Sequence, residues 1–120
     1  MYYQVLHINN KSKESIEAEV RLNSNHEVFK GHFPGQPVLP GACMVQMLRA
    51  ILEQAMQCEF KLSKASNIKF LSVVVPNIHT TIKYTIDIKS VSEDKLAVES
   101  QLWAGEVSSM KFSGLYKMER

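Results

Sequence analysis

The sequence lacks the features that mark membrane, disulfide-rich and nucleic-acid-binding proteins. It contains two cysteines, and no apolar run approaches the ~20 residues that span a bilayer. Its formal net charge of +2 is too small to indicate binding of nucleic acid. The four histidines are scattered without the spacing of metal ligands. We therefore expect a soluble protein with no metal, no cofactor, no membrane partner and no nucleic-acid partner.

Length and composition fit one globular domain. The chain has 120 residues, of which 45% are hydrophobic and 22% are charged, so it is long enough to bury a core. No linker, repeat or low-complexity segment divides it, and we expect a single domain over residues 1–120. The first residues, Met1 to Val5, have neither a basic opening nor an apolar signal segment, which favours the cytoplasm.

The two cysteines are predicted to be free thiols. We expect Cys43 and Cys58 on one helix, where their separation corresponds to about 22 Å at ~1.5 Å per residue, too far for a disulfide. Cys43 lies near the expected helix start, where a thiolate is favoured, and is a candidate nucleophile. The simpler interpretation is a small buried residue.

Glycine and proline are scarce, and most of them gather in one segment. The chain has five glycines and four prolines. Three of each lie in residues 31–41, whose sequence is GHFPGQPVLPG, so that His32 is presented by a loop with few conformations to lose. An apolar, helical pattern begins at Ala42, and the unpaired amides at a helix start attract negative charge. A histidine beside such amides indicates proton transfer with stabilisation of an oxyanion.

Hydrophobic periodicity predicts one long helix and an antiparallel sheet. Apolar residues cover most of residues 42–57, while Gln46, Arg49, Glu53 and Gln57 form a narrow polar stripe, as expected for a helix enclosed by a sheet. We expect Arg49 to pair with Glu53 one turn further along. Strands are predicted over residues 2–8, 16–22, 67–75, 80–90, 95–104 and 107–118. The first two should form a hairpin, and the whole is of the α+β class.

The proline-rich segment carries a family resemblance. Its pattern, His-x-Phe-Pro-Gly-x-Pro-x-x-Pro-Gly followed by an apolar helix, resembles the motif of the hotdog-fold 3-hydroxyacyl-[acyl carrier protein] dehydratases. Weaker likeness continues through Ile68 to Leu71 and Val75-Pro76. The resemblance implies a hotdog fold, in which an antiparallel sheet of about six strands wraps around one long central helix. It also implies subunits joined edge to edge, as a homodimer or a dimer-based oligomer.

The same resemblance implies roles for individual residues. His32 would act as the base that removes the α proton of a 3-hydroxyacyl thioester. The amides of Gly41 and Ala42 would hold the oxyanion that forms. Phe33 and Pro40 would shape the loop that binds the substrate, which is carried by an acyl carrier protein or coenzyme A. The reaction would eliminate water in fatty-acid or related acyl-chain biosynthesis.

One position departs from the dehydratase pattern. Fourteen residues after His32, where those dehydratases carry Glu or Asp, this chain has Gln46. A carboxamide cannot exchange a proton at any useful pH, although it can donate to and accept from a hydroxyl or a water. Three functions therefore stay open: a dehydratase in which His32 handles both proton transfers, an acyl-thioester hydrolase of the hotdog fold, and a noncatalytic acyl- or carrier-binding subunit that could form a heterodimer. Gln46 could also be one member of a solvent-facing polar stripe.

Basic residues near the expected site elements suggest how a carrier would approach. Acyl carrier proteins are acidic, and these side chains could steer the encounter. Ordinary solvated lysines are the alternative interpretation. The residues are Lys30, Arg49, Lys61, Lys64 and Lys69.

Overall fold

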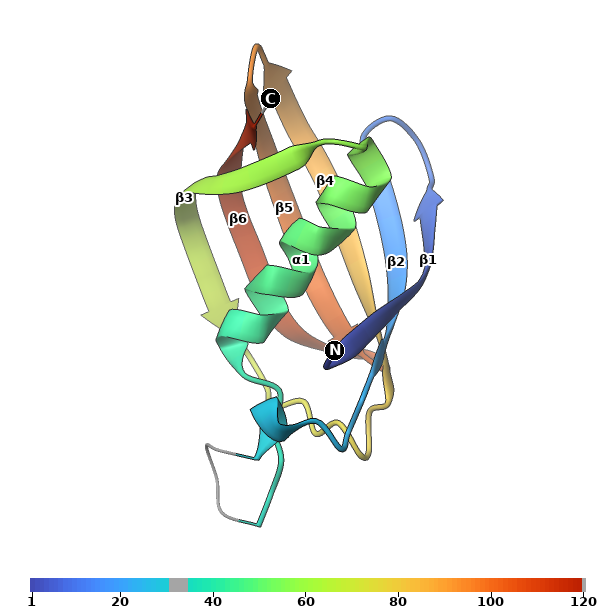
Figure 1. The fold of residues 1–120 in the computed structure, drawn as a ribbon. Helices are drawn as coiled ribbons and strands as arrows, with labels where there is room; N and C mark the ends of the chain where they lie inside the picture. The colour runs from blue at the N-terminus through green and yellow to red at the C-terminus, as the bar shows by residue number, and fades with distance from the viewer. Residues whose placement is uncertain (31–34, 120) are drawn as a thin grey trace.

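The protein is one long helix held against a curved antiparallel sheet (Figure 1). This computed structural model describes residues 1–30 and 35–119. The helix α1 spans Gly41–Met56, and a short 3₁₀ helix, η1, spans Glu27–Phe29. The strands are β1 (Tyr3–Asn10), β2 (Ser15–Leu22), β3 (Glu59–Phe70), β4 (Thr81–Ser92), β5 (Lys95–Ala104) and β6 (Val107–Glu119). The α+β class predicted from the sequence is confirmed.

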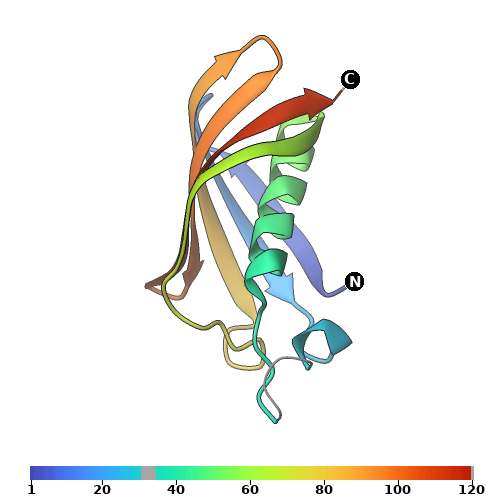
Figure 2. The ribbon, with the colours of Figure 1, turned by 90° about the vertical axis from the view of Figure 1, so that its left-hand side faces the viewer.

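The strands form a single sheet in the order β1-β2-β4-β5-β6-β3, and every neighbouring pair is antiparallel. The predicted hairpin of the first two strands is confirmed. Although β3 follows α1 directly in the chain, it lies at the far edge of the sheet beside β6. Seen from the side, the sheet curls so that β3 and β6 reach across toward the end of α1 (Figure 2). The sheet thus wraps around the helix.

Apolar periodicity explains how α1 is enclosed. Its residues Met47, Leu48, Ile51 and Leu52 are fully buried, which is the spacing of one side of a helix. Burying each such side chain contributes about 1.5–3 kcal/mol to stability. From the middle of the sheet, the Tyr84 hydroxyl donates a 2.6 Å hydrogen bond to the carbonyl oxygen of the helical residue Met44. Among the described residues, no helix is long and apolar enough to cross a membrane.

The third strand is the element whose bounds differ most from the prediction made from the sequence. The bounds predicted for this strand, 67–75, were wrong: β3 begins at Glu59 and ends at Phe70, so the prediction overlaps it only over residues 67–70. As an edge strand it is mostly exposed and interrupted by two irregularities of register, so it shows no period-two alternation. Val74 is buried outside any strand, and its carbonyl oxygen accepts a 2.9 Å hydrogen bond from the Leu39 amide. The apolar Val74 therefore looked like a strand residue in the sequence, although it is buried as part of a loop.

A glycine on β6 allows β3 to bend between those irregularities. Gly114 pairs with Ala65 of β3. A Cβ atom at Gly114 would lie 2.6 Å from the backbone carbonyl oxygen of Lys64, which is closer than real Cβ contacts allow. The close approach of the two backbones therefore requires glycine at this position.

The end of α1 also differs from the prediction. The helix stops at Met56 and Gln57 caps it in the left-handed conformation, so Cys58 is not on the helix with Cys43 as predicted. Both cysteines are nevertheless free thiols, as expected. The expected Arg49–Glu53 pair is absent from the ion pairs of the described residues. The Glu53 carboxylate instead accepts a 2.8 Å hydrogen bond from the Phe60 amide.

Candidate active site

The start of α1 leaves two backbone donors available. Pro40 is the N-cap and has no side-chain capping bond, and its carbonyl oxygen accepts from the amides of Cys43 at 3.0 Å and Met44 at 3.2 Å. Within the described part of the chain, the amides of Gly41 and Ala42 donate to no acceptor. Ala42 is exposed. Two free N–H groups at the positive end of a helix dipole can bind an oxyanion.

An exposed aromatic ring lies against this helix start. Phe70, at the end of β3, is 54% exposed. A Cβ atom at Gly41 would lie 2.6 Å from Cζ of the Phe70 ring, so the ring packs where a side chain would otherwise project. The residue was not predicted as part of the site, although it lies in the Ile68 to Leu71 segment that carries the weaker likeness. The helix start therefore combines two free amides with an apolar wall.

Gln46 lies on the exposed side of α1, and its side chain has a specific partner. The Tyr2 hydroxyl donates a 2.9 Å hydrogen bond to Gln46 Oε1 and lies 3.5 Å from the carbonyl oxygen of Cys43. Tyr2 precedes β1 and is 44 positions away in the chain. No sequence pattern links the two residues, so only the fold reveals their contact.

Packing fixes the Tyr2 ring from a second element. Its ring stands edge-on to Phe29 at 6.1 Å and to His26 at 5.9 Å, both at η1. The His26 Nδ1 atom accepts a 3.0 Å hydrogen bond from the Val28 amide and caps η1. Burial raises the pKa of Tyr2 well above its ordinary value, so the hydroxyl stays a donor at neutral pH. Tyr2 thereby connects the first strand, η1 and α1.

Cys43 is not arranged as a nucleophile. It is only 5% exposed. Burial raises the pKa of its thiol, and the hydrogen bond with Tyr2 opposes that effect without cancelling it. The interpretation as a small buried residue is the one that this environment favours.

Of the predicted site residues, the structure brings Pro40, Gly41, Ala42 and Gln46 together over the first two turns of α1. His32 and Phe33 lie outside the described residues. Within the described residues, no group of three metal-ligating side chains is present.

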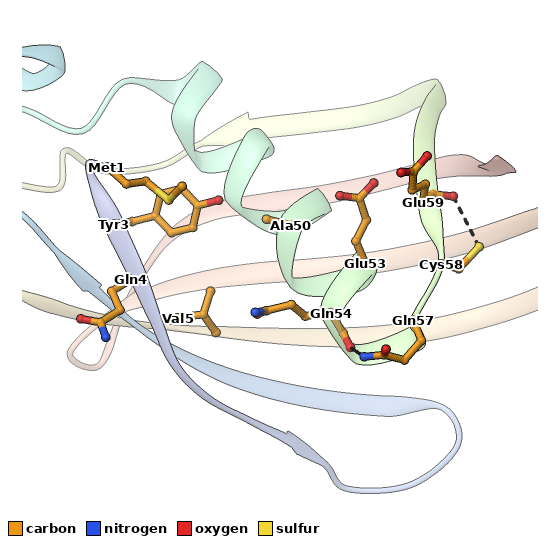
Figure 3. Close-up of a pocket in the computed structure, with 10 residues that line it drawn as sticks. All are labelled: Met1, Tyr3, Gln4, Val5, Ala50, Glu53, Gln54, Gln57, Cys58 and Glu59. Atoms are coloured by element: carbon orange, nitrogen blue, oxygen red, sulfur yellow. Dashed lines mark hydrogen bonds between the residues drawn. The ribbon is translucent and has the colours of Figure 1, made fainter. Parts of the chain in front are cut away.

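A groove of about 770 Å³ runs beside the second half of α1 (Figure 3). It starts at Ala50, one turn beyond Gln46, and ends at Glu59. Of the predicted site residues that the structure describes, none lines it, and the Glu53 carboxylate in its wall already accepts a hydrogen bond from the Phe60 amide. Among the described residues, the lining consists of Met1, Tyr3, Gln4, Val5, Ala50, Glu53, Gln54, Gln57, Cys58 and Glu59. The groove is therefore separate from the helix start.

Comparison with known proteins identifies the family. The family model described as ApeI-like, ApeI dehydratase, matches residues 8–111. The chain belongs to the ApeI-like dehydratase family. The chain is also similar in sequence to the 3-hydroxyacyl-[acyl-carrier-protein] dehydratase FabZ of Lactobacillus helveticus. The two are 31% identical over 106 residues, which cover 74% of this chain and 72% of the relative.

Other relatives match over a shorter stretch. The FabZ dehydratase of Wolinella succinogenes is 51% identical over 35 residues, or 29% of this chain. The matched part is 23% of that relative, and 27% and 25% of the FabZ dehydratases of Oenococcus oeni and Enterococcus faecalis. The chain thus spans about a quarter of the length of these relatives in the matched alignments.

Solved structures confirm the hotdog fold of this ApeI-like chain. The structure named "The Dehydratase Heterocomplex ApeI:P from Xenorhabdus doucetiae" matches with a TM-score of 0.73 and 20% identity, covering 100% of both chains. A mutant thioesterase from Pseudomonas aeruginosa matches with a TM-score of 0.66 and 9% identity, covering 95% of this chain and 80% of that one. Dehydratases and thioesterases share the fold, so at these identities the fold by itself does not assign the reaction.

Proposed function

We propose that the protein is a hydro-lyase that removes water from a 3-hydroxyacyl thioester in fatty-acid or related acyl-chain biosynthesis. The observation that carries the proposal is the pair of free amides at Gly41, the last residue of the motif at 31–41, and Ala42, the residue after it. Membership of a dehydratase family supports the reaction class. The names of the FabZ relatives support an acyl-carrier-protein thioester as substrate, with coenzyme A as the other carrier to test.

The proposed mechanism uses His32 and the helix start. His32 in its neutral form removes the α proton, and the thioester carbonyl oxygen accepts hydrogen bonds from the amides of Gly41 and Ala42. Those donors stabilise the enolate, and one such donor is typically worth about 10²–10³ in rate. The carbon–oxygen bond at the β position then breaks, and the proton on His32 passes to the departing hydroxyl, so that water leaves. Phe33 and Pro40 shape the surrounding loop.

In this proposal Gln46 forms a hydrogen bond to the substrate and does not act as an acid. It orients the departing hydroxyl, or a water next to it, without supplying a proton. A missing general acid costs roughly 10²–10⁴-fold in rate, which His32 recovers in part by making both proton transfers. We therefore expect a slower or more specialised dehydratase than one with a carboxylate at this position.

A dimer and an acidic carrier fit the exposed surfaces. β3 is a twelve-residue edge strand that ends at the exposed Phe70, and the exposed Leu71 follows it. An edge with unpaired backbone groups and apolar side chains favours pairing with another subunit, either an identical chain or a related one. The basic residues proposed to attract an acyl carrier protein are all exposed: Lys30, Arg49, Lys61, Lys64 and Lys69. The two free thiols are compatible with the reducing cytoplasm as the compartment.

Mass-spectrometric turnover of 3-hydroxyacyl chains on an acyl carrier protein tests the proposal. We expect the unmodified protein to give a loss of 18 Da, the mass of one water molecule, His32→Ala to abolish it and Gln46→Glu to accelerate it. Rate losses of about 10²–10⁴ are usual when a general base is removed. His7→Ala is the matched control, since His7 is an exposed histidine on β1 that is not part of the proposed site.

Other results identify the alternatives. Release of free thiol without loss of water would assign an acyl-thioester hydrolase. No turnover of any acyl chain, together with tight carrier binding, would assign a noncatalytic subunit and contradict the catalytic role of His32. Mixing with a second hotdog chain and following size-exclusion mass would then test for a heterodimer.

A further inference from the structure

We propose that Tyr2 is a positioning residue that holds the Gln46 carboxamide in one orientation, with its oxygen engaged and its amino group presented to the bound acyl thioester. This inference rests on the proposed function and makes it more specific. Gln46 would then act as a hydrogen-bond donor to a substrate oxygen. Tyr2 would determine that the Gln46 amino group, and not its oxygen, faces the substrate, without itself touching the substrate.

The contact geometry supports the assignment of donor and acceptor. The Tyr2 hydroxyl has one proton, and Gln46 Oε1 at 2.9 Å is a better acceptor than the Cys43 carbonyl oxygen at 3.5 Å. A carboxamide whose oxygen accepts this bond turns its Nε2 group the other way. Within the described residues, Gln46 Nε2 has no acceptor. Its two N–H donors are therefore available to a ligand.

The packing of Tyr2 makes the orientation rigid. The ring is held edge-on by the fully buried Phe29 and by His26. Its backbone carbonyl oxygen accepts a 2.9 Å hydrogen bond from the Asn23 amide. A side chain fixed at both ring and backbone loses little further freedom when it directs a neighbour, which is the property of a supporting residue.

The chemistry at this position follows from the contact. A carboxamide held in this way donates at any pH, whereas a carboxylate in its place would accept the Tyr2 hydrogen bond in its charged form. The glutamine therefore suits binding and orientation of a hydroxyl or carbonyl oxygen. Without the Tyr2 hydroxyl, the carboxamide is free to rotate, and with its oxygen turned toward the substrate it no longer donates to the substrate oxygen.

The test compares Tyr2→Phe with Tyr3→Phe. Each change removes one hydroxyl, but within the described residues the Tyr3 hydroxyl has no hydrogen-bond partner, so Tyr3→Phe is the matched control. We measure kcat and KM for dehydration, and the Kd of an unreactive amide analogue of the 3-hydroxybutyryl carrier. For Tyr2→Phe we expect kcat/KM to fall and Kd to rise about fivefold to tenfold, the usual worth of one hydrogen bond. Tyr3→Phe should match the unmodified protein.

A double-mutant cycle separates positioning from simple stabilisation. Adding Tyr2→Phe to Gln46→Ala should cause no further loss in kcat/KM or Kd, because the group that Tyr2 directs is already gone. Equal values for Tyr2→Phe and Tyr3→Phe, or losses that add in the double variant, would overturn the inference while leaving the dehydratase proposal intact. An unmodified protein that neither dehydrates the substrate nor binds the analogue would overturn both proposals. If it binds without dehydrating, the dehydratase proposal alone fails and the Kd values decide the role of Tyr2.

Discussion

The two ends of α1 are built in opposite ways. At the C-terminal end, Gln57 has a left-handed conformation and its amide bonds back to the Glu53 carbonyl oxygen. The Gln57 side chain donates a 2.9 Å bond to the Gln54 carbonyl oxygen, and the Glu53 carboxylate receives the Phe60 amide at 2.8 Å. The carbonyl oxygens of Glu53 and Gln54 in the last turn of the helix are thus paired here, and the start of β3 is bonded to the helix through Phe60.

At the N-terminal end the equivalent groups are left open. Pro40 offers no side-chain cap, and the amides of Gly41 and Ala42 have no acceptor within the described residues. A capping serine or aspartate would typically add about 1 kcal/mol of stability at such a position. The comparison teaches that local stability is concentrated at the end that anchors the fold, while the other end keeps its donors free for a ligand.

We call the C-terminal end of α1 the closed end, because its backbone groups are paired, and the N-terminal end the open end. The largest expected effect comes from removing a hydrogen bond at the closed end. Glu53→Ala removes the acceptor of the buried Phe60 amide, and we expect a loss of about 1–3 kcal/mol in the free energy of unfolding. Urea denaturation followed by circular dichroism measures it. Gln54→Ala is the control, because Gln54 is exposed and a change to alanine at the next helical position has a similar effect on helix propensity. Equal stabilities for the two variants would show that the Glu53 contact contributes nothing.

The alkylation rates of the two cysteines compare the accessibility of the two ends of α1. Cys43 is buried near the open end with a raised pKa, whereas Cys58 is half-buried just past the closed end. We expect iodoacetamide at pH 8 to label Cys58 about tenfold faster or more, because alkylation requires an accessible thiolate. Peptide mapping by mass spectrometry gives both rates, and labelling in urea should equalise them. Faster labelling of Cys43 would restore it as a candidate nucleophile.

A smaller change tests the wall of the open end. Gly41→Ala places a methyl group where the Phe70 ring now lies, and the half-exposed ring can swing aside. We expect stability to change by less than about 1 kcal/mol, since alanine also favours the helix, while dehydration slows severalfold. Steady-state kinetics with thermal unfolding separates these effects. Activity should return in Gly41→Ala/Phe70→Leu, and a double variant as slow as the single one would remove Phe70 from the explanation.

The smallest expected effect is a gain in stability from a substitution at the residue that caps the closed end. Gln57→Gly should stabilise the protein by about 0.5 kcal/mol, because glycine adopts a positive φ without strain and Gln57 has a φ of 53°. The lost side-chain bond to the Gln54 carbonyl oxygen is exposed and offsets part of the gain. Gln54→Gly, inside the helix, should instead destabilise by about 1 kcal/mol. Thermal unfolding of the pair measures both signs.

Strongly alternating segments were readable from the sequence. The prediction of a strand over 95–104 coincides with β5, and the predicted helix over 42–57 differs from α1 by one residue at each end. These elements bury one face regularly, so their period is visible in the chain. β3 was not readable, since an irregular edge strand with exposed polar residues has no such period.

The site divides in the same way. The motif spacing located Pro40, Gly41 and Ala42 at the helix start, and it singled out Gln46. The partner of Gln46 could not be predicted, because Tyr2 lies outside the motif and reaches the helix only through the packing of β1 and η1. Contacts of this kind depend on how distant segments are placed, which local pattern does not encode.

The position of β3 also governs the order in which the molecule can assemble. Its partner in the sheet is the final strand, so Glu59 pairs with Glu119 across half of the chain. Such long loops must close before their contacts stabilise anything, which slows folding. During synthesis the part of the apolar core that β3 and β6 complete stays uncovered until β6 has left the ribosome. Newly made chains are therefore expected to expose this apolar surface to chaperones and to other nascent copies before the sheet can close.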